Sequence, residues 1–250
     1  LVALCDVKPK ESLGLDAWDV PYFTDVATML RAVPETDVVC VATPNGLHVP
    51  ISLLALNHGK HVVCEKPMGL TKASCEALLS KALQKHRHLF GVMQNRYSPP
   101  SQWVKEMVEE KRLGEIFLVQ INCYWNREAR YYKAGGWKGT KDLDGGTLFT
   151  QFSHFVDIMY WLFGDITDIH GRFADFNHTD LTAFEDSGLV NFRFLDGGFE
   201  GQRLCRLERR NRGSHLGCGA GIDRKTAVHL FGHRHMSAQN QRRAEGAEQP

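Results

Sequence analysis

The amino-acid sequence predicts an α/β protein in which a doubly wound parallel sheet is followed by an α+β domain with an open, mainly antiparallel sheet. Three observations lead to this prediction. Short runs rich in valine and leucine alternate with helix-length stretches through the first hundred residues. Longer, partly alternating runs surround one aromatic-rich helical stretch between residues 98 and 198. After about residue 199 both periodicities fade and arginine becomes frequent.

The first region, residues 1–97, is predicted to be a dinucleotide-binding domain of the Rossmann type. Strands are expected at residues 1–5, 37–42, 61–64 and 88–93, and helices at 25–33, 49–57 and 71–85. Apolar strands that are each followed by a helix form parallel sheets buried on both faces. A glycine-rich phosphate loop precedes the acidic residue of such a domain by about 20 residues. The sequence holds no such loop before Asp6, so we expect an N-terminal truncation that removed the first strand and the loop.

The second region, residues 98–198, is predicted to be an incomplete α+β domain for substrate binding and oligomerisation. Helices are expected at 101–110 and 147–163, and strands at 116–125 and 189–194. Gly164 is a suitable end for the second helix. Residues 199–250 are expected to be an irregular basic tail, and a shift of reading frame is the preferred explanation for it. A basic arm that binds nucleic acid is the weaker alternative, because Glu208 and Asp223 interrupt the positive charge.

The composition of the 250-residue chain excludes several classes of function. The chain is 43% hydrophobic and 24% charged with a net charge of +1, so no strong field attracts nucleic acid or an anionic membrane. No apolar run approaches the roughly 20 residues that cross a bilayer. The seven cysteines form no CxxC pair, which indicates reduced thiols and a cytoplasmic protein.

Asp6 follows the first apolar strand directly and is the candidate ligand of the adenosine ribose. An acid in this position accepts hydrogen bonds from the ribose hydroxyls and repels a 2′-phosphate, so it favours NAD over NADP. Lys8 and Lys10 weaken that preference and leave NADP possible. The alternative is an aspartate that only stabilises a turn.

Two further motifs follow strand ends, where parallel α/β sheets bind their ligands. In the first, Thr43, Pro44 and Asn45 with His48 offer hydrogen bonds to a ribose or nicotinamide, although Asn45 could simply cap the next helix. In the second, Lys66 follows Glu65 at the end of a strand. Partial burial there would lower the pKa of the lysine toward the range of a catalytic acid or base. A Glu-Lys-Pro loop without function is the alternative.

His154 is the candidate acid or base. Oxidation of an alcohol by hydride transfer requires a base for the hydroxyl proton, and histidine serves this purpose near neutral pH. Thr150, His154 and Asp157 share one face of the predicted helix, so Asp157 could orient the imidazole or cap a neighbouring element. The alternative is a hydrogen-bonded histidine of the core.

Together these motifs resemble the glucose–fructose oxidoreductase / inositol dehydrogenase (Gfo/Idh/MocA) family. The residues that carry the resemblance are Thr43-Pro44-Asn45 with His48, Glu65-Lys66-Pro67, Gln94 to Tyr97 with Pro99, Gly145-Gly146 and His154. The resemblance implies NAD(P)-linked oxidation or reduction of sugars and polyols, and homo-oligomers, dimers or tetramers, that pair through the open sheet. It also implies that Lys66 bonds the reacting hydroxyl and the nicotinamide ribose, and that His154 lies near the reacting carbon. Thr150 departs from the aspartate that many members carry, which leaves proton transfer to Lys66 and His154.

The segment from Gly135 to Gly146 resembles the branch of the family that oxidises C3 of UDP-linked N-acetylated sugars, a substrate class that implies polysaccharide biosynthesis. Trp137 could stack on a uracil or sugar, and nearby cations could meet a diphosphate or carboxylate. These cations are Arg127, Arg130, Lys138 and Lys141. A basic loop anchored by one tryptophan is the alternative.

The sequence therefore predicts an NAD-dependent sugar dehydrogenase, with a free sugar, polyol or dihydrodiol as the alternative substrate and an inactive fragment as the alternative of another class. The predicted cofactor site contains Asp6, Thr43, Pro44, Asn45, His48, Glu65, Lys66, Gln94 and Arg96. The predicted substrate site contains Lys66, Tyr97, Arg127, Trp137, Lys138, Thr150, Gln151 and His154. A small-molecule sugar or sugar nucleotide is the expected partner, without nucleic acid or membrane. No metal is expected, because the spacing of Cys218, His229, His233 and His235 fits no standard zinc site.

Overall fold

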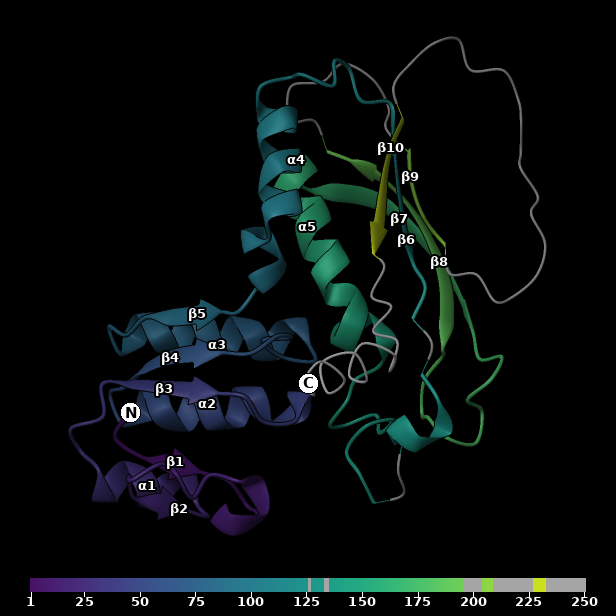
Figure 1. Ribbon diagram of the computed structural model, residues 1–250. Helices are drawn as coiled ribbons and strands as arrows, with labels where there is room; N and C mark the ends of the chain where they lie inside the picture. The colour runs from purple at the N-terminus through teal and green to yellow at the C-terminus, as the bar shows by residue number, and fades with distance from the viewer. Residues whose placement is uncertain (126, 133–134, 196–203, 209–226, 233–250) are drawn as a thin grey trace, which may run out of the picture. The chain divides into compact units, whose positions relative to one another are not determined.

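A computed structural model describes residues 1–125, 127–132, 135–195, 204–208 and 227–232, with the backbone alone described in the last two ranges (Figure 1). The chain divides into two compact units. The first comprises Leu1–Glu106, Glu128–Leu162 and Asp175–Asp186, and the second comprises Met107–Arg127, Phe163–Ala174 and the chain from Ser187 onwards. No described helix is both long enough and apolar enough to cross a membrane.

The strands of the first unit form two parallel sheets. Strand β1 (Leu4–Cys5) pairs with β2 (Tyr22–Phe23), and β4 (His61–Cys64) lies between β3 (Val38–Val41) and β5 (Leu89–Gly91). All three of these pairings are parallel. The sequence predicts the parallel strands β1, β3, β4 and β5, whereas β2 is missing from the prediction. Over residues 1–125, which are described without a gap, no ladder joins the two sheets.

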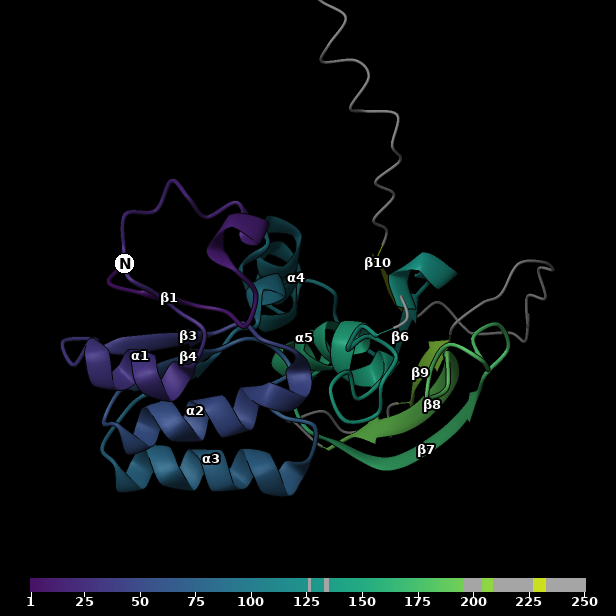
Figure 2. The same cartoon turned by 90° about the horizontal axis from the view of Figure 1, so that it is seen from below.

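Three helices accompany these strands. They are α1 (Val26–Ala32), α2 (His48–Asn57) and α3 (Lys72–Gln84). Helix α2 contacts β3, β4 and α3, and Figure 2 shows α2 and α3 side by side. Residues Val39, Leu56, Val62 and Leu78 from these elements form the centre of the hydrophobic core, which explains why the helices pack against the sheet.

The helix starts follow from local capping chemistry. The Asp25 carboxylate accepts a hydrogen bond of 2.7 Å from the Thr28 backbone N–H, and Thr71 Oγ1 accepts one of 3.2 Å from the Ser74 N–H. Such caps satisfy backbone donors that have no partner within the helix. They define the beginnings of α1 and α3 within a residue of the predicted positions.

The first unit also contains four short 3-10 turns and most of two further helices. The short 3-10 turns are η1 (Lys10–Leu13), η2 (Asn45–Leu47), η3 (Gln94–Tyr97) and η4 (Ala129–Tyr132). Helix α4 spans Pro99–Glu109 and α5 spans Ser153–Phe163. The predicted helix over residues 147–163 is not uniform, because its beginning, η5 (Leu148–Phe152), is a π-helical turn.

The second unit contains one five-stranded sheet in the order β10-β6-β9-β8-β7. Its strands are β6 (Leu118–Cys123), β7 (Ile166–Ala174), β8 (Ser187–Phe194), β9 (Leu204–Glu208) and β10 (Ala227–Gly232). The pairs β7–β8 and β8–β9 are antiparallel, whereas β6–β9 and β10–β6 are parallel. The sheet is therefore mixed rather than mainly antiparallel. Two of its strands lie within residues 199–250, where the sequence predicts an irregular tail.

Strand β7 is missing from the sequence prediction. Its side chains are exposed along most of its length, so it lacks the alternation that identifies a half-buried strand. The ring of Phe173 covers two glycines instead, since a Cβ added to Gly171 or Gly188 would lie 2.7 or 2.5 Å from this ring. An aromatic ring over strand glycines compensates for the packing that they lack.

Candidate functional site

The predicted cofactor motifs gather at one edge of the sheet. In the parallel register, Val41 of β3 lies opposite Cys64 of β4, and Cys64 lies opposite Gly91 of β5. The ladder continues past the strand ends, because the Glu65 N–H donates to the Val41 carbonyl and the Val92 N–H donates to the Cys64 carbonyl, both at 2.9 Å. The three loops that follow these strands therefore emerge side by side. They carry Thr43 to His48, Glu65-Lys66 and Gln94 to Tyr97.

Asn45 connects two distant segments of the first unit. Its side chain is only 6% exposed, and its amide donates a hydrogen bond of 2.8 Å to the Asp144 carbonyl. Gly46 beside it approaches the same segment so closely that an added Cβ would lie 2.0 Å from the Asp142 carbonyl oxygen. Asn45 was expected to face a cofactor or to cap α2. The structure engages its amide with another loop, and no side-chain cap is present at the start of η2 or α2, both within the described residues.

The imidazole of His48 is 1% exposed and lies between two loops. Nδ1 lies 2.6 Å from the Pro67 carbonyl oxygen, and Nε2 lies 2.8 Å from the Thr43 carbonyl oxygen. Both ring nitrogens are thus engaged with backbone. This geometry favours a role in holding the loops over the direct cofactor contact that the sequence predicts.

Lys66 is held against the turn that precedes His154. Its ammonium group donates to the Thr150 carbonyl oxygen, across 84 residues of sequence. The carboxylate of the neighbouring Glu65 accepts a hydrogen bond of 3.1 Å from the Lys66 backbone N–H. The two predicted catalytic residues, Lys66 and His154, therefore belong to segments joined by a direct hydrogen bond.

The π-helical turn places Thr150 for this contact. The Thr150 hydroxyl donates a hydrogen bond of 3.1 Å to the Gly146 carbonyl. Thr150 is also buried, at 7% exposed. His154 follows in the first turn of α5 and is 6% exposed, while Gln151 is half-buried. Single π-helical turns occur frequently at functional sites. Thr150 therefore contributes its backbone carbonyl to Lys66, while its hydroxyl is engaged with the Gly146 carbonyl.

Asp157 does not serve His154 in the way that helical spacing suggests. Its carboxylate accepts two hydrogen bonds from Arg96, from Nε at 2.8 Å and from Nη2 at 2.6 Å. These bonds raise the pKa of the Arg96 guanidinium above its usual range. Arg96 was expected at the cofactor, and it joins η3 to α5 instead. Its neighbours Gln94 and Tyr97 are exposed, with Tyr97 at 80%.

Asp6 lies directly after β1 and is exposed. One carboxylate oxygen accepts a hydrogen bond of 2.9 Å from the Lys8 backbone N–H, so the residue does stabilise a turn. This contact leaves the carboxylate at the surface of the strand end, where the adenosine ribose of a dinucleotide binds in this class of fold.

The predicted substrate loop is organised by a buried carboxylate. Asp144 is fully buried and accepts a hydrogen bond of 2.8 Å from the Gly139 backbone N–H. Trp137 is half-buried. The ammonium of Lys138 lies 4.0 Å from the centre of the Tyr131 ring and 6.0 Å from that of Trp137, which is cation–π geometry. The ammonium of Lys138 thus lies within cation–π distance of two aromatic rings, one of them in η4.

The other predicted cations are not gathered with Lys138. Arg130 pairs with Glu128 at 2.6 Å, and both side chains are exposed. Lys141 is also exposed. Arg127 is assigned to the second unit.

A second loop, Asp175–Asp186, supports the substrate loop. The Ala183 N–H donates to the Gly139 carbonyl at 2.9 Å, and the Tyr132 ring meets the His178 ring edge-on with centroids 5.3 Å apart. Thr147 Oγ1 donates to the Glu185 carbonyl at 3.4 Å. These contacts were not predicted, because they join residues that carry no local pattern.

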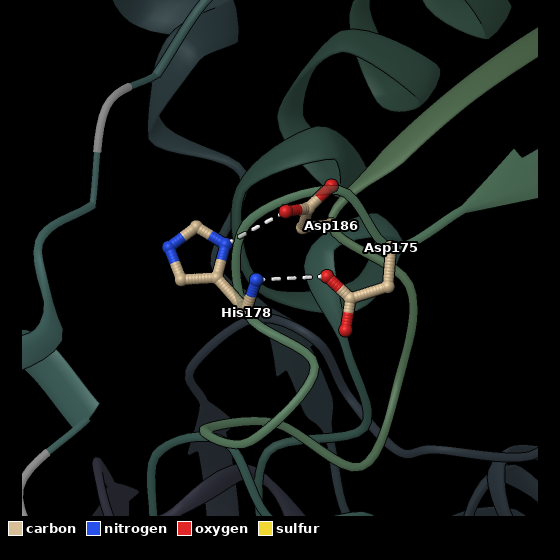
Figure 3. Close-up of side chains that lie close together, drawn as sticks. All are labelled: Asp175, His178 and Asp186. Carbon is tan, nitrogen blue, oxygen red and sulfur yellow. Dashed lines mark hydrogen bonds and ion pairs between the residues drawn. The ribbon is translucent and has the colours of Figure 1, made fainter.

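The same loop contains three side chains that could hold a metal ion, Asp175, His178 and Asp186 (Figure 3). Their potential ligand atoms lie within 4.8 Å of one another. However, N–H groups already point at these carboxylates. His178 Nδ1 lies 2.8 Å from Asp186, and the Asn177 and His178 backbone N–H groups donate to Asp186 and Asp175 at 2.9 Å each. The cluster has the hydrogen bonding of a loop anchor rather than of a cation site. The residues considered for zinc, Cys218, His229, His233 and His235, have no described side chains.

Comparison with known proteins identifies the family. Residues 1–93 match the model of an oxidoreductase family with an NAD-binding Rossmann fold, and residues 101–210 match the GFO/IDH/MocA C-terminal domain. The chain therefore belongs to the Gfo/Idh/MocA oxidoreductase family, and the predicted Rossmann-like α/β class is confirmed.

Relatives with curated descriptions include sugar dehydrogenases. The chain is 31% identical over 183 residues to an oxidoreductase of Synechocystis sp., covering 69% of this chain and 49% of that protein. It is 30% identical over 174 residues to the D-glucoside 3-dehydrogenase of Escherichia coli, covering 66% of this chain and 46% of that protein. The chain thus spans about half the length of these relatives.

Among solved structures, the chain is similar to the WlbA dehydrogenase from Bordetella pertussis in complex with NADH and UDP-GlcNAcA. The identity is 30%, the TM-score is 0.76, and the match covers 83% of this chain and 58% of that one. WlbA from Chromobacterium violaceum, described with the same two ligands, matches with the same identity and TM-score, and the match covers 84% of this chain and 59% of that one.

The residues at the sheet edge fit the nicotinamide cofactor that the family implies. The Thr43 hydroxyl oxygen is buried and makes no hydrogen bond to any residue that the structure describes, so it can serve a ribose or amide group. Asp6 offers an exposed carboxylate after β1. Gly46 and Gly69 are required for packing, against Asp142 and against Val49 and Cys75 respectively, and not for a phosphate.

Proposed function

We propose that this chain is part of an NAD-dependent dehydrogenase that oxidises a sugar hydroxyl, with the C3 hydroxyl of a nucleotide-linked N-acetylated sugar as the favoured substrate. The observation that supports this proposal is the hydrogen bond between the Lys66 ammonium and the Thr150 carbonyl, one turn before His154. This bond connects Lys66, the candidate proton-handling residue after β4, to the turn that precedes His154, the candidate base in α5.

The geometry supports a division of labour between the two residues. An ammonium group has three N–H donors. Lys66 can therefore hold the Thr150 carbonyl and also donate to a substrate hydroxyl, which orients that hydroxyl and stabilises the oxygen as it loses its proton. His154 takes the proton as general base. Bound NAD supplies the acceptor for the hydride.

Cofactor contacts follow from the strand ends. Asp6 would hold the adenosine ribose, and Thr43 and Pro44 would face the nicotinamide half. The exposed Asp6 carboxylate repels a 2′-phosphate, which favours NAD over NADP. Measuring the affinity of the purified chain for NADH and NADPH by fluorescence titration tests this preference, with Asp6→Ser expected to narrow the difference.

The substrate assignment rests on the aromatic loop and on the WlbA structures. The ammonium of Lys138 lies within cation–π distance of the rings of Tyr131 and Trp137. Aromatic rings can stack on a uracil base, and a lysine can meet a diphosphate or a sugar carboxylate. The WlbA dehydrogenases that resemble this chain were solved with UDP-GlcNAcA.

A free sugar or a dihydrodiol is the second candidate substrate. It is favoured by the similarity to D-glucoside 3-dehydrogenase and by the 28% identity to a cyclohexadiene dihydrodiol dehydrogenase of Comamonas testosteroni, over 64% of this chain and 40% of that protein. Neither of the substrates for which these relatives are named contains a nucleotide.

A substrate panel separates the candidates. UDP-GlcNAcA, a free glucoside and a cyclic dihydrodiol would each be supplied with NAD, and NADH formation would be followed by absorbance. Turnover of the UDP-sugar alone supports the proposal, and turnover of the glucoside or the dihydrodiol alone supports the second candidate. A folded chain that binds no NADH in the titration would support an inactive fragment and overturn both.

A further inference from the structure

The substrate loop, residues 135–146, contains no helix or strand and carries Trp137 and Lys138. Its backbone is organised by Asp144, which is fully buried. The Asp144 carboxylate accepts a hydrogen bond of 2.8 Å from the Gly139 backbone N–H. Because Gly139 directly follows Lys138, the position of Asp144 determines where the backbone of Lys138 lies.

Two hydrogen bonds attach the end of the substrate loop to the loop that follows β3. The Asn45 side-chain amide donates to the Asp144 carbonyl at 2.8 Å, and the Gly46 N–H donates to the Leu143 carbonyl at 3.0 Å. Both donors are N–H groups and both acceptors are carbonyl oxygens, so neither bond depends on a protonation state. Asn45 is only 6% exposed, so water competes little for its amide.

The two attached loops differ in how firmly the fold holds them. Residues 42–47 span only the gap between the end of β3 and the start of α2, and β3 is paired with β4. The substrate loop is longer, and segments without regular structure open more easily than strands and helices. Its middle is attached at Gly139, whose carbonyl accepts from the Ala183 N–H at 2.9 Å. The loop after β3 is therefore the fixed partner, and the substrate loop is the one that the contact positions.

We propose that Asn45 is a positioning residue for the substrate loop, acting through its hydrogen bond to the Asp144 carbonyl. Asp144 in turn holds the backbone beside Lys138, so Asn45 influences the affinity for the sugar substrate without contacting the sugar. A loop released from this bond spends less time in the arrangement that binds substrate, and the apparent affinity falls by the same fraction. The effect on the sugar rests on the proposed function, whereas the hold on the loop does not.

Steady-state kinetics of Asn45→Ala with NAD and UDP-GlcNAcA test the effect on the sugar. We expect KM for the sugar nucleotide to rise by about 10-fold, the size of one lost buried hydrogen bond, and KM for NAD to stay close to its original value. Asn57→Ala, at the exposed end of α2, is the matched control and should change neither. An equal or larger rise in KM for NAD would assign Asn45 to the cofactor instead. A lower kcat with both KM values unchanged would reduce Asn45 to a folding role, and unchanged kinetics would refute the proposal outright.

Amide hydrogen exchange of the unaltered chain, followed by nuclear magnetic resonance, tests the hold on the loop without turnover and without a variant. The Gly46 N–H is bonded across the contact, and the Gly139 N–H is bonded to Asp144 within the loop. If the contact holds the loop, one opening releases both amides, so we expect similar protection factors. Protection that differs by more than about tenfold would mean that one opens without the other, which contradicts the proposal.

The exchange measurement remains decisive if Asn45→Ala does not fold. In a folded Asn45→Ala chain, the protection of the Gly139 amide should fall, and in Asn57→Ala it should not. Absent turnover in the unaltered chain would count against the proposed function, while the exchange results would still decide whether Asn45 holds the loop.

Discussion

Arg96 and Asp157 join η3 to α5 through two parallel hydrogen bonds between a guanidinium and a carboxylate, 61 residues apart in sequence. The Asp157 side chain is 10% exposed and that of Arg96 is 31% exposed. Fork-shaped pairs of this kind add geometric specificity to their electrostatic attraction. The pair therefore fixes the direction of α5, the helix that begins with the turn of His154.

Removing the charge of Asp157 is expected to destabilise the fold. Asp157→Asn leaves the guanidinium without its ionised partner in a largely buried setting, which should lower the free energy of unfolding by about 1–3 kcal/mol. Urea titration measures this change. Glu128→Gln removes the partner of Arg130 in an exposed pair and should leave the midpoint unchanged. Equal midpoints for both variants would mean that the Arg96 pair contributes nothing.

Lys66 is expected to act in turnover rather than in folding. Lys66→Met removes the ammonium that donates to the Thr150 carbonyl, and we expect kcat to fall by about 10²–10⁴-fold, the usual contribution of a group that handles a proton. Lys105→Met is the matched control, because Lys105 of α4 also donates to a backbone carbonyl, that of Trp161 in α5, at 2.8 Å. Similar losses of kcat in the two variants would remove the special role of Lys66.

Gly46 is expected to tolerate no side chain. An alanine Cβ would lie 2.0 Å from the Asp142 carbonyl oxygen, and only movement of backbone can relieve this contact. We expect Gly46→Ala to lower the free energy of unfolding by roughly 1–3 kcal/mol and to break the neighbouring bond of Asn45. At Gly91 an added Cβ meets only the flexible end of Met68 at 3.4 Å, so Gly91→Ala should be far milder. Differential scanning calorimetry of the two variants and the unaltered chain measures both changes in stability.

The cap of α1 should produce a dependence of stability on acid pH. The hydrogen bond from the Thr28 side chain, followed by the one from its backbone N–H, lowers the pKa of Asp25 below its ordinary value of 3.8. The ionised cap therefore stabilises the fold fully above this ordinary pKa of 3.8, which the unfolded chain has. The contribution disappears as the pH falls through the lower pKa of the folded state. Asp25→Asn keeps an acceptor but does not titrate. The advantage of the native chain over this variant should shrink between pH 5 and pH 2, in thermal unfolding scans at about those values. A constant difference would contradict the assignment.

The cysteines at the sheet should differ in reactivity. Burial raises the pKa of the Cys64 thiol, which is fully buried at the end of β4. Cys40, in β3, is exposed. Because the thiolate is the reactive form, we expect iodoacetamide to modify Cys40 well before Cys64 in the folded chain, as measured by mass spectrometry of peptides. Unfolding in urea should remove the difference, and equal rates without urea would contradict the burial of Cys64.

Local patterns predict most of the first unit. The runs Val38–Val41 and His61–Cys64 are valine-rich and form the expected parallel strands. Thr71 caps α3 because a threonine before an amphipathic stretch is a strong start signal, independent of tertiary structure. The mixed order of the second sheet could not be derived in this way. The residues of one strand do not indicate which distant strand it pairs with, or in which direction. Strand β7 escaped because its exposed side chains do not alternate.

The candidate site was predicted by residue type but not by contact. The catalytic roles of Lys66 and His154 stay predictions. The hydrogen bond from Lys66 to Thr150, in the turn before His154, could not be derived from the sequence, because no local rule links residues this far apart. Asn45 and Arg96 were selected as cofactor ligands, yet each binds a distant part of the chain. Ideal helical spacing suggested that Asp157 could orient the His154 imidazole. In the structure the Asp157 carboxylate accepts hydrogen bonds from Arg96.

The π-helical turn at Leu148–Phe152 makes the length of this segment part of the site. Each residue of a regular helix turns the chain by about 100°. Deleting one residue from the turn would restore regular winding, but it would also rotate everything before it relative to His154. The Thr150 carbonyl would then leave the Lys66 ammonium, although every named side chain would remain. In this molecule a count of residues, and not only their identity, determines which groups meet.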